Sequence, residues 1–291
     1  MKKHLKWLIP VLVVCLIAGI VTGVAVFMSL KNRGSVMPER VTGIVAVSRD
    51  GKETFLSDKT RVFPGDRIRT DATSTVVLPL GKNGSLFLSE NSEATYTWED
   101  KRPVLTLSFG SLVVNLDKPE DARVKTGDQL VSTGGEVYLL RVGEAGTSVS
   151  VFSGSAGFER TGKDPLKVEA GSFVRMKVGE SGFTYDGEGK IALLDVPKDC
   201  LAYIGSLART SGRTLYLTSS EIASALLEKN RTYTVTFKNP DGTVFVTTGV
   251  KSGEKVSKPR LSPELDGHWD FDFSTPIYND TEIFWVRESE T

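Results

Sequence analysis

The residues that could carry out acid-base chemistry are few in this sequence and lie far apart. Histidine, the usual proton shuttle near neutral pH, occurs only at His4 and His268. Asp66 follows Pro64 and Gly65 between two β-rich runs, and acid-base catalysis would need a positioned partner group beside it. Proline fixes φ, glycine permits a positive φ, and aspartate bonds nearby backbone N–H groups. This stretch therefore indicates a turn and not a catalytic carboxylate.

The acidic stretch DGHWDFDF could suggest a calcium site at Asp266, Asp270 and Asp272. An EF-type loop, however, needs oxygen ligands at alternating positions, a central glycine and a late glutamate. That pattern is absent, and aspartates two residues apart on a strand form one solvated face. The Cys/His spacing of zinc sites is absent as well. We therefore assign no catalytic, cofactor-binding or metal-binding residue, and we expect a non-enzymatic protein without a cofactor.

The elements that would position any site begin with an apolar run over residues 8–30, which contains no charge. At about 1.5 Å per residue this run exceeds the roughly 30 Å hydrocarbon thickness of a bilayer, so a helix could span it. A cleavable signal peptide would have a shorter apolar region and a small-residue cleavage site. A lipoprotein signal would place small residues before Cys15. We predict an uncleaved signal anchor over 8–30, with a short cytoplasmic segment 1–7 and the bulk of the chain extracytoplasmic.

The predicted anchor divides the charges and the cysteines. The chain has 36 basic and 36 acidic residues, and three lysines precede the anchor, so the outer part is slightly acidic. Such a surface gives no electrostatic footprint for nucleic acid. Cys15 would lie in the membrane and Cys200 outside it, so the two cannot pair within one chain. Cys200 is interpreted as a buried thiol.

Gly19 and Gly23 form a GxxxG motif inside the apolar run. Two glycines one helical turn apart let helix backbones approach closely, which can drive self-association into a homodimer. The alternative is that glycine is simply frequent in membrane helices. Both interpretations stay open at this point.

Short β runs fill residues 41–185, after a linker at 31–40, and turn residues separate them at regular intervals. Thr95 and Thr97, for example, alternate with Tyr96 and Trp98, so the two faces of that run differ. Regularly spaced strands with turn signals predict an antiparallel β sandwich or a barrel-like domain. The runs are VTGIVAV, STVVLPL, GSLFLS, ATYTW, VLTLS, SLVVN, EVYLLRV, SVSVF and SFVRMKV.

The period changes in residues 186–230, where we predict a small α/β segment. IALLDVP and TLYLT have strand composition, and LAYIGSLA places its apolar residues on one helical face. Thr218 stands before Glu221 as a start signal for a second helix, which would bury Ile222, Ala225 and Leu226. Residues 231–291 return to β, with Asp241-Gly242 as the turn of a hairpin.

Aromatic side chains could stack on sugar rings or anchor a partner. Alternating aromatics on strands more often belong to the core, because half of each strand faces inward. The residues concerned are Tyr96, Trp98, Trp269, Phe271, Phe273, Phe284 and Trp285.

The first β region resembles the FecR-type extracytoplasmic domain. The resemblance rests on Pro64-Gly65-Asp66 with Ile68 and Thr70 after it, on GSLFL, on GSLVV and on SVSVFSGSAGFE, in that order. LLDVP, LAYIGSLART and TLYL look like half of the short domain found in secretins and TonB-dependent receptors. The tail, with Asp241-Gly242, Gly253-Glu254 and Trp269, is similar to an internalin-type B repeat, which implies a β-grasp-like surface module.

Two functions follow from these features. The first is a single-pass envelope protein that binds a wall polymer or a surface protein, or that serves as a scaffold. The second is a signalling component, because FecR-type proteins often relay an outside event to a sigma factor. The predicted inner segment 1–7 is too short to fold by itself, so a relay would require a partner membrane protein. An enzyme is the remaining and least favoured alternative.

Overall fold

The structure is a computed structural model that describes residues 34–80, 84–118, 121–127, 130–134, 136–160, 163–179, 182–210, 212–260 and 266–287. The predicted anchor 8–30, with Gly19 and Gly23, and the predicted segment 1–7 lie outside these residues. No helix in the described ranges is long and apolar enough to cross a membrane.

The described chain is mainly β, as predicted, and its elements follow one another from β1 to β20. The strands of the larger body are β1 (Arg40–Thr42), β2 (Val45–Arg49), β3 (Lys52–Phe55), β4 (Arg67–Thr70), β5 (Thr75–Leu80), β6 (Gly84–Leu88), β7 (Ser92–Glu99), β8 (Arg102–Asn115), β9 (Arg123–Thr126), β10 (Leu130–Gly134), β11 (Val137–Gly143), β12 (Gly146–Ser153), β13 (Ser155–Arg160), β14 (Lys163–Glu169), β15 (Ser172–Gly179) and β16 (Gly182–Lys190). The remaining elements are the 3-10 turn η1 (Leu193–Asp195), the helices α2 (Lys198–Thr210) and α3 (Ser219–Asn230), and the strands β17 (Thr232–Lys238), β18 (Val244–Lys251), β19 (His268–Trp269) and β20 (Thr281–Val286).

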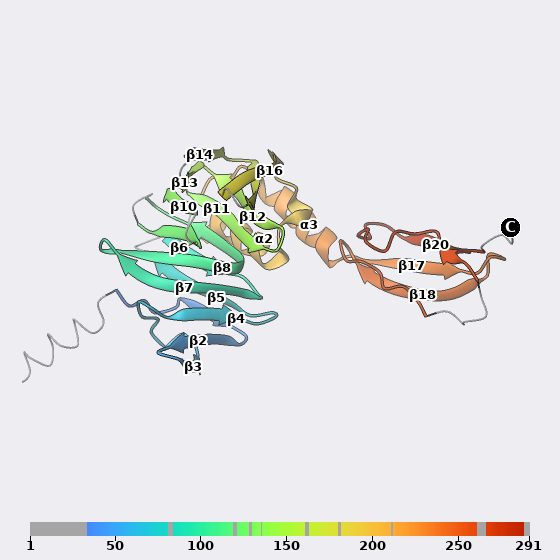
Figure 1. Cartoon of the computed structure of the whole chain (residues 1–291), viewed down its shortest axis with the longest axis horizontal. Helices are drawn as coiled ribbons and strands as arrows, with labels where there is room; N and C mark the ends of the chain where they lie inside the picture. Colours follow the sequence, from blue (N-terminus) through green and yellow to red (C-terminus); the bar gives the residue numbers. More distant parts are fainter. Residues whose placement is uncertain are drawn as a thin grey trace, which may run out of the picture.

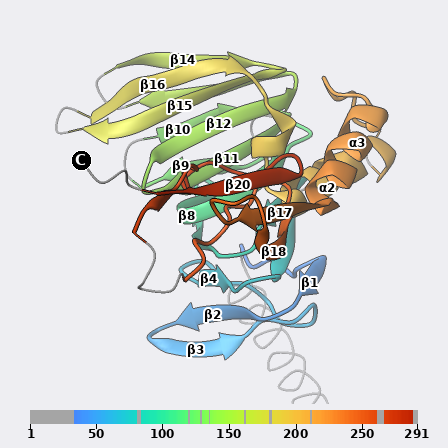
Figure 2. The ribbon, with the colours of Figure 1, turned by 90° about the vertical axis from the view of Figure 1, so that its right-hand side faces the viewer.

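The strands β1–β16 form two layers that share one long strand, β8. Its first half pairs with β7 and β9, and its second half pairs with β6 and β11. One layer continues as β1-β5-β6-β8-β11-β12-β15-β16, and the other runs β3-β2-β4-β7-β8-β9-β10-β13-β14. Figures 1 and 2 show these strands stacked through the larger body. The body is therefore a two-layered β structure, and the described strands do not close into a barrel.

Gly110 allows β8 to pass from one layer to the other. Its φ is +95°, and a Cβ there would come within 2.2 Å of the Ser92 hydroxyl oxygen, so only glycine fits without strain. The runs VLTLS and SLVVN are consequently parts of one strand, although the sequence predicts two separate strands. One further difference from the predicted antiparallel pattern is that β8 and β9 run parallel.

Apolar side chains from both layers pack together between them. Ile68, Tyr96 and Leu105 come from one layer, and Leu78 and Leu112 come from the other. All are almost completely buried. Alternation along strands such as β7 and β4 puts these side chains inside, because successive residues of a strand face opposite sides.

Helices α2 and α3 cover part of the outer face of the layer that contains β11 and β12. Leu201, Ile204 and Ile222 of the helices pack on Val113 and Leu139 of that face. The helix start predicted at Thr218 is confirmed and has the form of a capping box, since the Thr218 hydroxyl accepts from the Glu221 N–H and the Glu221 carboxylate accepts from the Thr218 N–H. Ile222 and Ala225 are buried, as expected, whereas Leu226 is only partly buried.

The two strands predicted within residues 186–230 are wrong. Leu193–Asp195 forms a 3-10 turn, and residues 214–218 form no strand. Leu215 and Leu217 pack against the helices and the sheet face, which accounts for their apolar character without strand pairing. After β16 ends at Lys190, the segment is therefore a pair of helices laid on the sheet, without the two predicted strands.

Strands β17–β20 form a separate four-stranded sheet in the order β18-β17-β20-β19. The predicted hairpin turn is present, with Gly242 at φ +83°, and β17 and β20 run parallel. The module is therefore a mixed sheet whose two central strands are parallel. Figure 1 shows this module at the end of α3, apart from the larger body. Glu228 of α3 links the two, because it accepts hydrogen bonds from the hydroxyls of Tyr233 and Ser252.

Candidate functional site

Asp66 holds the corner between β3 and β4 together and is completely buried. Arg49 donates from Nε and Nη2 to its two carboxylate oxygens, each at 2.6 Å, and the Phe63 N–H donates to Oδ2 at 2.8 Å. The guanidinium also lies 4.3 Å from the centre of the Phe63 ring. The hydrogen bond to Asp66 raises the pKa of Arg49. Both carboxylate oxygens are thus engaged in structure, which agrees with the turn predicted there.

The aspartates of DGHWDFDF also hold turns. Asp270 Oδ1 accepts from the Phe284 N–H at 2.7 Å, and Asp272 Oδ1 accepts from the Ser274 N–H at 2.8 Å. The hydrogen bonds from Ser274 lower the pKa of Asp272. The strand face expected for the pair is wrong, because β19 ends at Trp269. Across the described ranges, no three His, Cys, Asp or Glu side chains are grouped as metal ligands.

Most of the aromatic residues considered from the sequence belong to cores. Tyr96, Trp269 and Trp285 are buried, whereas Trp98 and Phe284 are each 37% exposed. The predicted preference for core packing therefore holds for the three buried rings.

A set of polar residues that the sequence analysis did not select forms the best candidate site. Arg141 on β11 lies opposite Ser148 on β12, and Ser148 lies opposite Arg175 on β15. Residues directly opposite one another in a sheet project from the same face, so these three side chains form one line across three strands. We call Arg141, Ser148 and Arg175 the arginine row.

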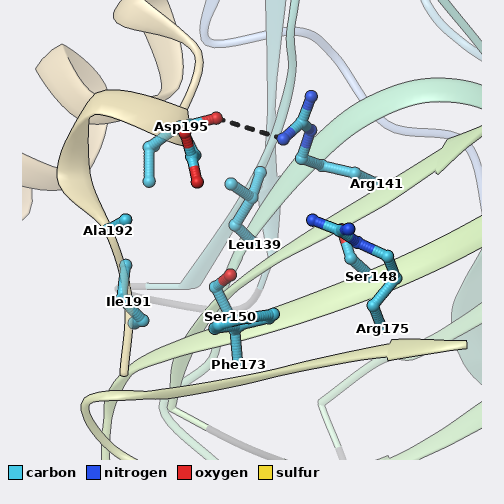
Figure 3. A pocket seen from close by; sticks show the side chains of 10 residues that line it. Leu139, Arg141, Ser148, Ser150, Phe173, Arg175, Ile191, Ala192 and Asp195 are labelled. Atoms are coloured by element: carbon cyan, nitrogen blue, oxygen red, sulfur yellow. Dashed lines mark hydrogen bonds between the residues drawn. The ribbon is translucent and has the colours of Figure 1, made fainter. Parts of the chain in front are cut away.

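The arginine row lies where the helical cover of this sheet face ends. Figure 3 shows Arg141 and Arg175 facing the segment 191–196. Ser148 lies on β12, the strand between the two that carry the arginines. Between row and segment is a cavity of about 40 Å³, lined also by Ser150 and Phe173. A more open hollow of about 400 Å³ borders Arg141 and Arg175 on the other side and includes Phe109, which is 52% exposed.

Asp195 and Lys229 are the charged residues next to the row on the side of the helices. Arg141 donates from Nη1 to the backbone oxygen of Asp195 at 3.1 Å, which fixes its position. Lys229 donates to the backbone oxygen of Leu194. Burial lowers the pKa of Lys229; the Asp195 carboxylate opposes this change, and Arg141 adds to it. Within the described ranges, neither Arg141 nor Arg175 forms a salt bridge, so both guanidinium charges remain available to a ligand.

The chemistry of the row is anion binding. A guanidinium presents N–H donors in a fixed fork that matches carboxylate and phosphate oxygens. Two strand spacings separate Arg141 from Arg175, which is about 10 Å between backbones, and their long side chains can close on one acidic group above Ser148. Sequence reasoning could not find this set, because 34 positions separate the two arginines and only the strand register brings them together.

Comparisons with known proteins return little that bears on this site. No protein-family model matches the chain, and no curated protein matches it. The FecR-type and B-repeat resemblances therefore have no independent sequence support. One similar solved structure is the crystal structure of a candidate anti-sigma factor from Parabacteroides distasonis, with 10% identity and a TM-score of 0.37, covering 77% of this chain and 99% of that one. A TM-score this low does not establish a shared fold, so no function is taken from it.

Proposed function

We propose that the chain is a non-enzymatic, extracytoplasmic component of a FecR-like relay, and that it binds an acidic segment of a partner protein on the arginine row. The observation that carries the binding part of this proposal is the line of Arg141, Ser148 and Arg175 on one sheet face. Neither arginine forms a salt bridge among the described residues, and although Asp195 also lines the cavity, an acidic ligand group would pair with both guanidinium groups.

The sizes of the two hollows support a protein segment as the ligand. The cavity of about 40 Å³ is far below the roughly 300–1,000 Å³ of pockets that enclose small molecules, and the neighbouring hollow of about 400 Å³, which lies within that range, is bordered by the exposed Phe109 and does not enclose a ligand. The cavity suits one carboxylate, while the neighbouring hollow and the exposed Phe109 suit the chain that carries it. An acidic side chain next to an apolar one would satisfy both features.

The binding of a wall polymer, which the sequence analysis offered together with binding of a surface protein, has no observation of its own in the structure or in the comparisons. An anionic polymer would present the same charges to the row, however. The test therefore has to tell a protein ligand from a polymer ligand.

Photo-crosslinking in cells gives that test. The full-length chain would carry a photoreactive amino acid at Ser148, and adducts would be separated by size and treated with protease or with wall hydrolase. We expect a discrete, protease-sensitive adduct. Arg141→Glu with Arg175→Glu should reduce it by about tenfold or more, since each charge-assisted hydrogen bond contributes about 1.5–3 kcal/mol.

Arg209→Glu is the matched control, because Arg209 is an exposed arginine on α2 away from the row. This variant should leave the adduct unchanged. A heterogeneous adduct that only wall hydrolase removes would restore the polymer hypothesis. Equal loss in the Arg209 variant, or no adduct at all, would refute the arginine row as a binding site.

A further inference from the structure

Strand β18 is a free edge of the C-terminal module. Its one neighbour among the described strands is β17, and no charged residue or proline occurs between Val244 and Val250. Val244 is 59% exposed, and Phe245 and Val246 are each 39% exposed. A long edge without charge or proline is a template for pairing with another strand.

The register of the β17–β18 hairpin shows which backbone groups point outward. Ser252 N–H donates to the Arg231 carbonyl at 2.9 Å, and the register continues by opposite pairs to Phe237 and Val246. In an antiparallel pair, hydrogen-bonded and non-hydrogen-bonded positions alternate. The N–H and C=O groups of Val246, Thr248 and Val250 are therefore used by β17. Those of Thr247 and Gly249 point to the free edge.

We propose that β18 pairs with β18 of a second copy of this chain, antiparallel and about a two-fold axis at Thr248. Thr247 and Gly249 of one copy then exchange hydrogen bonds with Gly249 and Thr247 of the other. This register follows from the outward groups, since each hydrogen-bonded pair has to join two outward-facing residues. The two four-stranded sheets become one continuous sheet.

The side chains of β18 fit this self-pairing. Thr248 lies opposite Thr248 of the other copy, and Val246 lies opposite Val250, which are favourable cross-strand pairs. Lys251 lies opposite Phe245, so no like charges meet. The register of the β17–β18 pair shifts between Phe237 and Lys238 of β17. The regular edge of β18 therefore ends near Phe245. An isologous contact requires such self-complementarity, and this is why a second copy is the occupant proposed.

A hollow of about 370 Å³ lies over the face of β18 that carries Val246, Thr248 and Val250. Val246, Thr248 and Val250 form one side, and the segment from Glu254 to Pro259 forms the other. Thr248 is exposed in this hollow, so a side chain placed there can reach its symmetry mate. This gives a test of the register itself.

Disulfide trapping distinguishes the proposed pair from random contact. In the full-length chain with Cys15→Ser, solubilised in mild detergent, Thr248→Cys places two thiols at a non-hydrogen-bonded pair about 4.5 Å apart between Cα atoms, within the range for a disulfide. Thr247→Cys is the control, because its symmetry mate is offset by two residues and lies beyond about 7 Å. The remaining thiol, Cys200, is buried.

We expect Thr248→Cys to form a linked dimer on mild oxidation and Thr247→Cys to remain monomeric on non-reducing gels. The result should persist when Gly19→Leu and Gly23→Leu are added, which separates this contact from association through residues 8–30. Failure of Thr248→Cys to link, or equal linking at both positions, would overturn the proposal.

A backbone variant gives an independent measurement. Thr247→Pro removes one outward N–H without touching the β17 ladder, so it deletes two of the four hydrogen bonds of the two central Thr247–Gly249 pairs. Sedimentation should show self-association weaker by about tenfold or more, whereas Thr247→Ala should match the parent chain. Unchanged association in a Thr247→Pro chain with native tryptophan fluorescence would refute the pairing. If this variant loses its fold, the comparison of Thr248→Cys with Thr247→Cys still decides.

Discussion

The larger body and the C-terminal module bury their sheet faces in different ways. In the body, two layers cover one another and two helices cover part of an outer face. In the module, one four-stranded sheet is covered on one side by its own loops around a small aromatic cluster. The body thus distributes its stability over many pairings, whereas the module depends on a few large side chains. A small core is marginal, because it buries less of the surface that its unfolded chain exposes.

The largest expected effect breaks the module and spares the body. The Trp285 ring packs edge-to-face on Trp269, with centroids 5.2 Å apart, and Trp269 packs on Phe237. Trp285→Ala should destabilise the module by about 3–5 kcal/mol and unfold it at ordinary temperature. Calorimetry should then show one transition, that of the body. Leu105→Ala should lower the body's transition instead, and a loss of both transitions with Trp285→Ala would show that the two regions fold as one.

A smaller effect is expected at the Asp66 corner of the body. Asp66→Asn keeps the volume of the side chain but presents an amide where Arg49 needs an acceptor. It should destabilise the body by about 2–3 kcal/mol, measured by urea unfolding. Asp100→Asn is a matched control, since Asp100 pairs with Arg123 at 3.4 Å but is 71% exposed. That substitution should cost less than about 1 kcal/mol, and equal costs would contradict a special role for the corner.

Alkaline pH should weaken the body through Tyr96. Burial raises the pKa of Tyr96 to about 12, and its hydroxyl donates to the Gly34 carbonyl at 2.6 Å. In the unfolded chain the same phenol loses its proton near pH 10. This contribution is therefore full below about pH 10 and is lost as pH rises to about 12, a change of about 2 kcal/mol.

Urea unfolding at about pH 9 and about pH 11.5 measures this loss, and Tyr96→Phe should remove that part of it. An undiminished loss in the Tyr96→Phe chain would assign the alkaline effect to other groups.

The smallest expected effect lies at α3, which connects the two regions. Thr218→Ala removes the side chain that accepts from the Glu221 N–H and should cost about 1 kcal/mol of helix stability. Hydrogen exchange should quicken in the first turn of α3, while Thr218→Ser should preserve protection. An unchanged exchange rate would mean that packing of Ile222 and Ala225, and not the cap, sets the start of this helix.

Much of the body could be predicted from local pattern. The alternation at Thr95–Trp98 places Tyr96 inside and indicates β7, and the Thr218 to Glu221 spacing indicates the start of α3. The sandwich follows from the regular spacing of such runs. These features depend on residues close in sequence, which is why they can be predicted from the sequence alone.

Other features depend on partners far away in the chain. TLYLT has strand composition, yet Leu215 and Leu217 meet helices and not a neighbouring strand. Gly110 marks a crossing between layers, although a glycine between two β runs normally indicates a break. Strand register brings Asp66 next to Arg49. In the same way, strand register alone places Arg141 and Arg175 in one row. Composition carries no information about register, so the candidate site could not be predicted.

The shared strand β8 also constrains how the body can be made. Its residues 102–115 need β6 and β7, which precede them, and β9 and β11, which follow. One layer runs to β14, which ends at Glu169, and the other runs to β16, which ends at Lys190, so neither layer can be completed during synthesis before residue 169 has emerged. The first hundred residues therefore remain incompletely paired until the later strands have been synthesised. A chain truncated before β11 should be degraded and should not form a smaller functional protein.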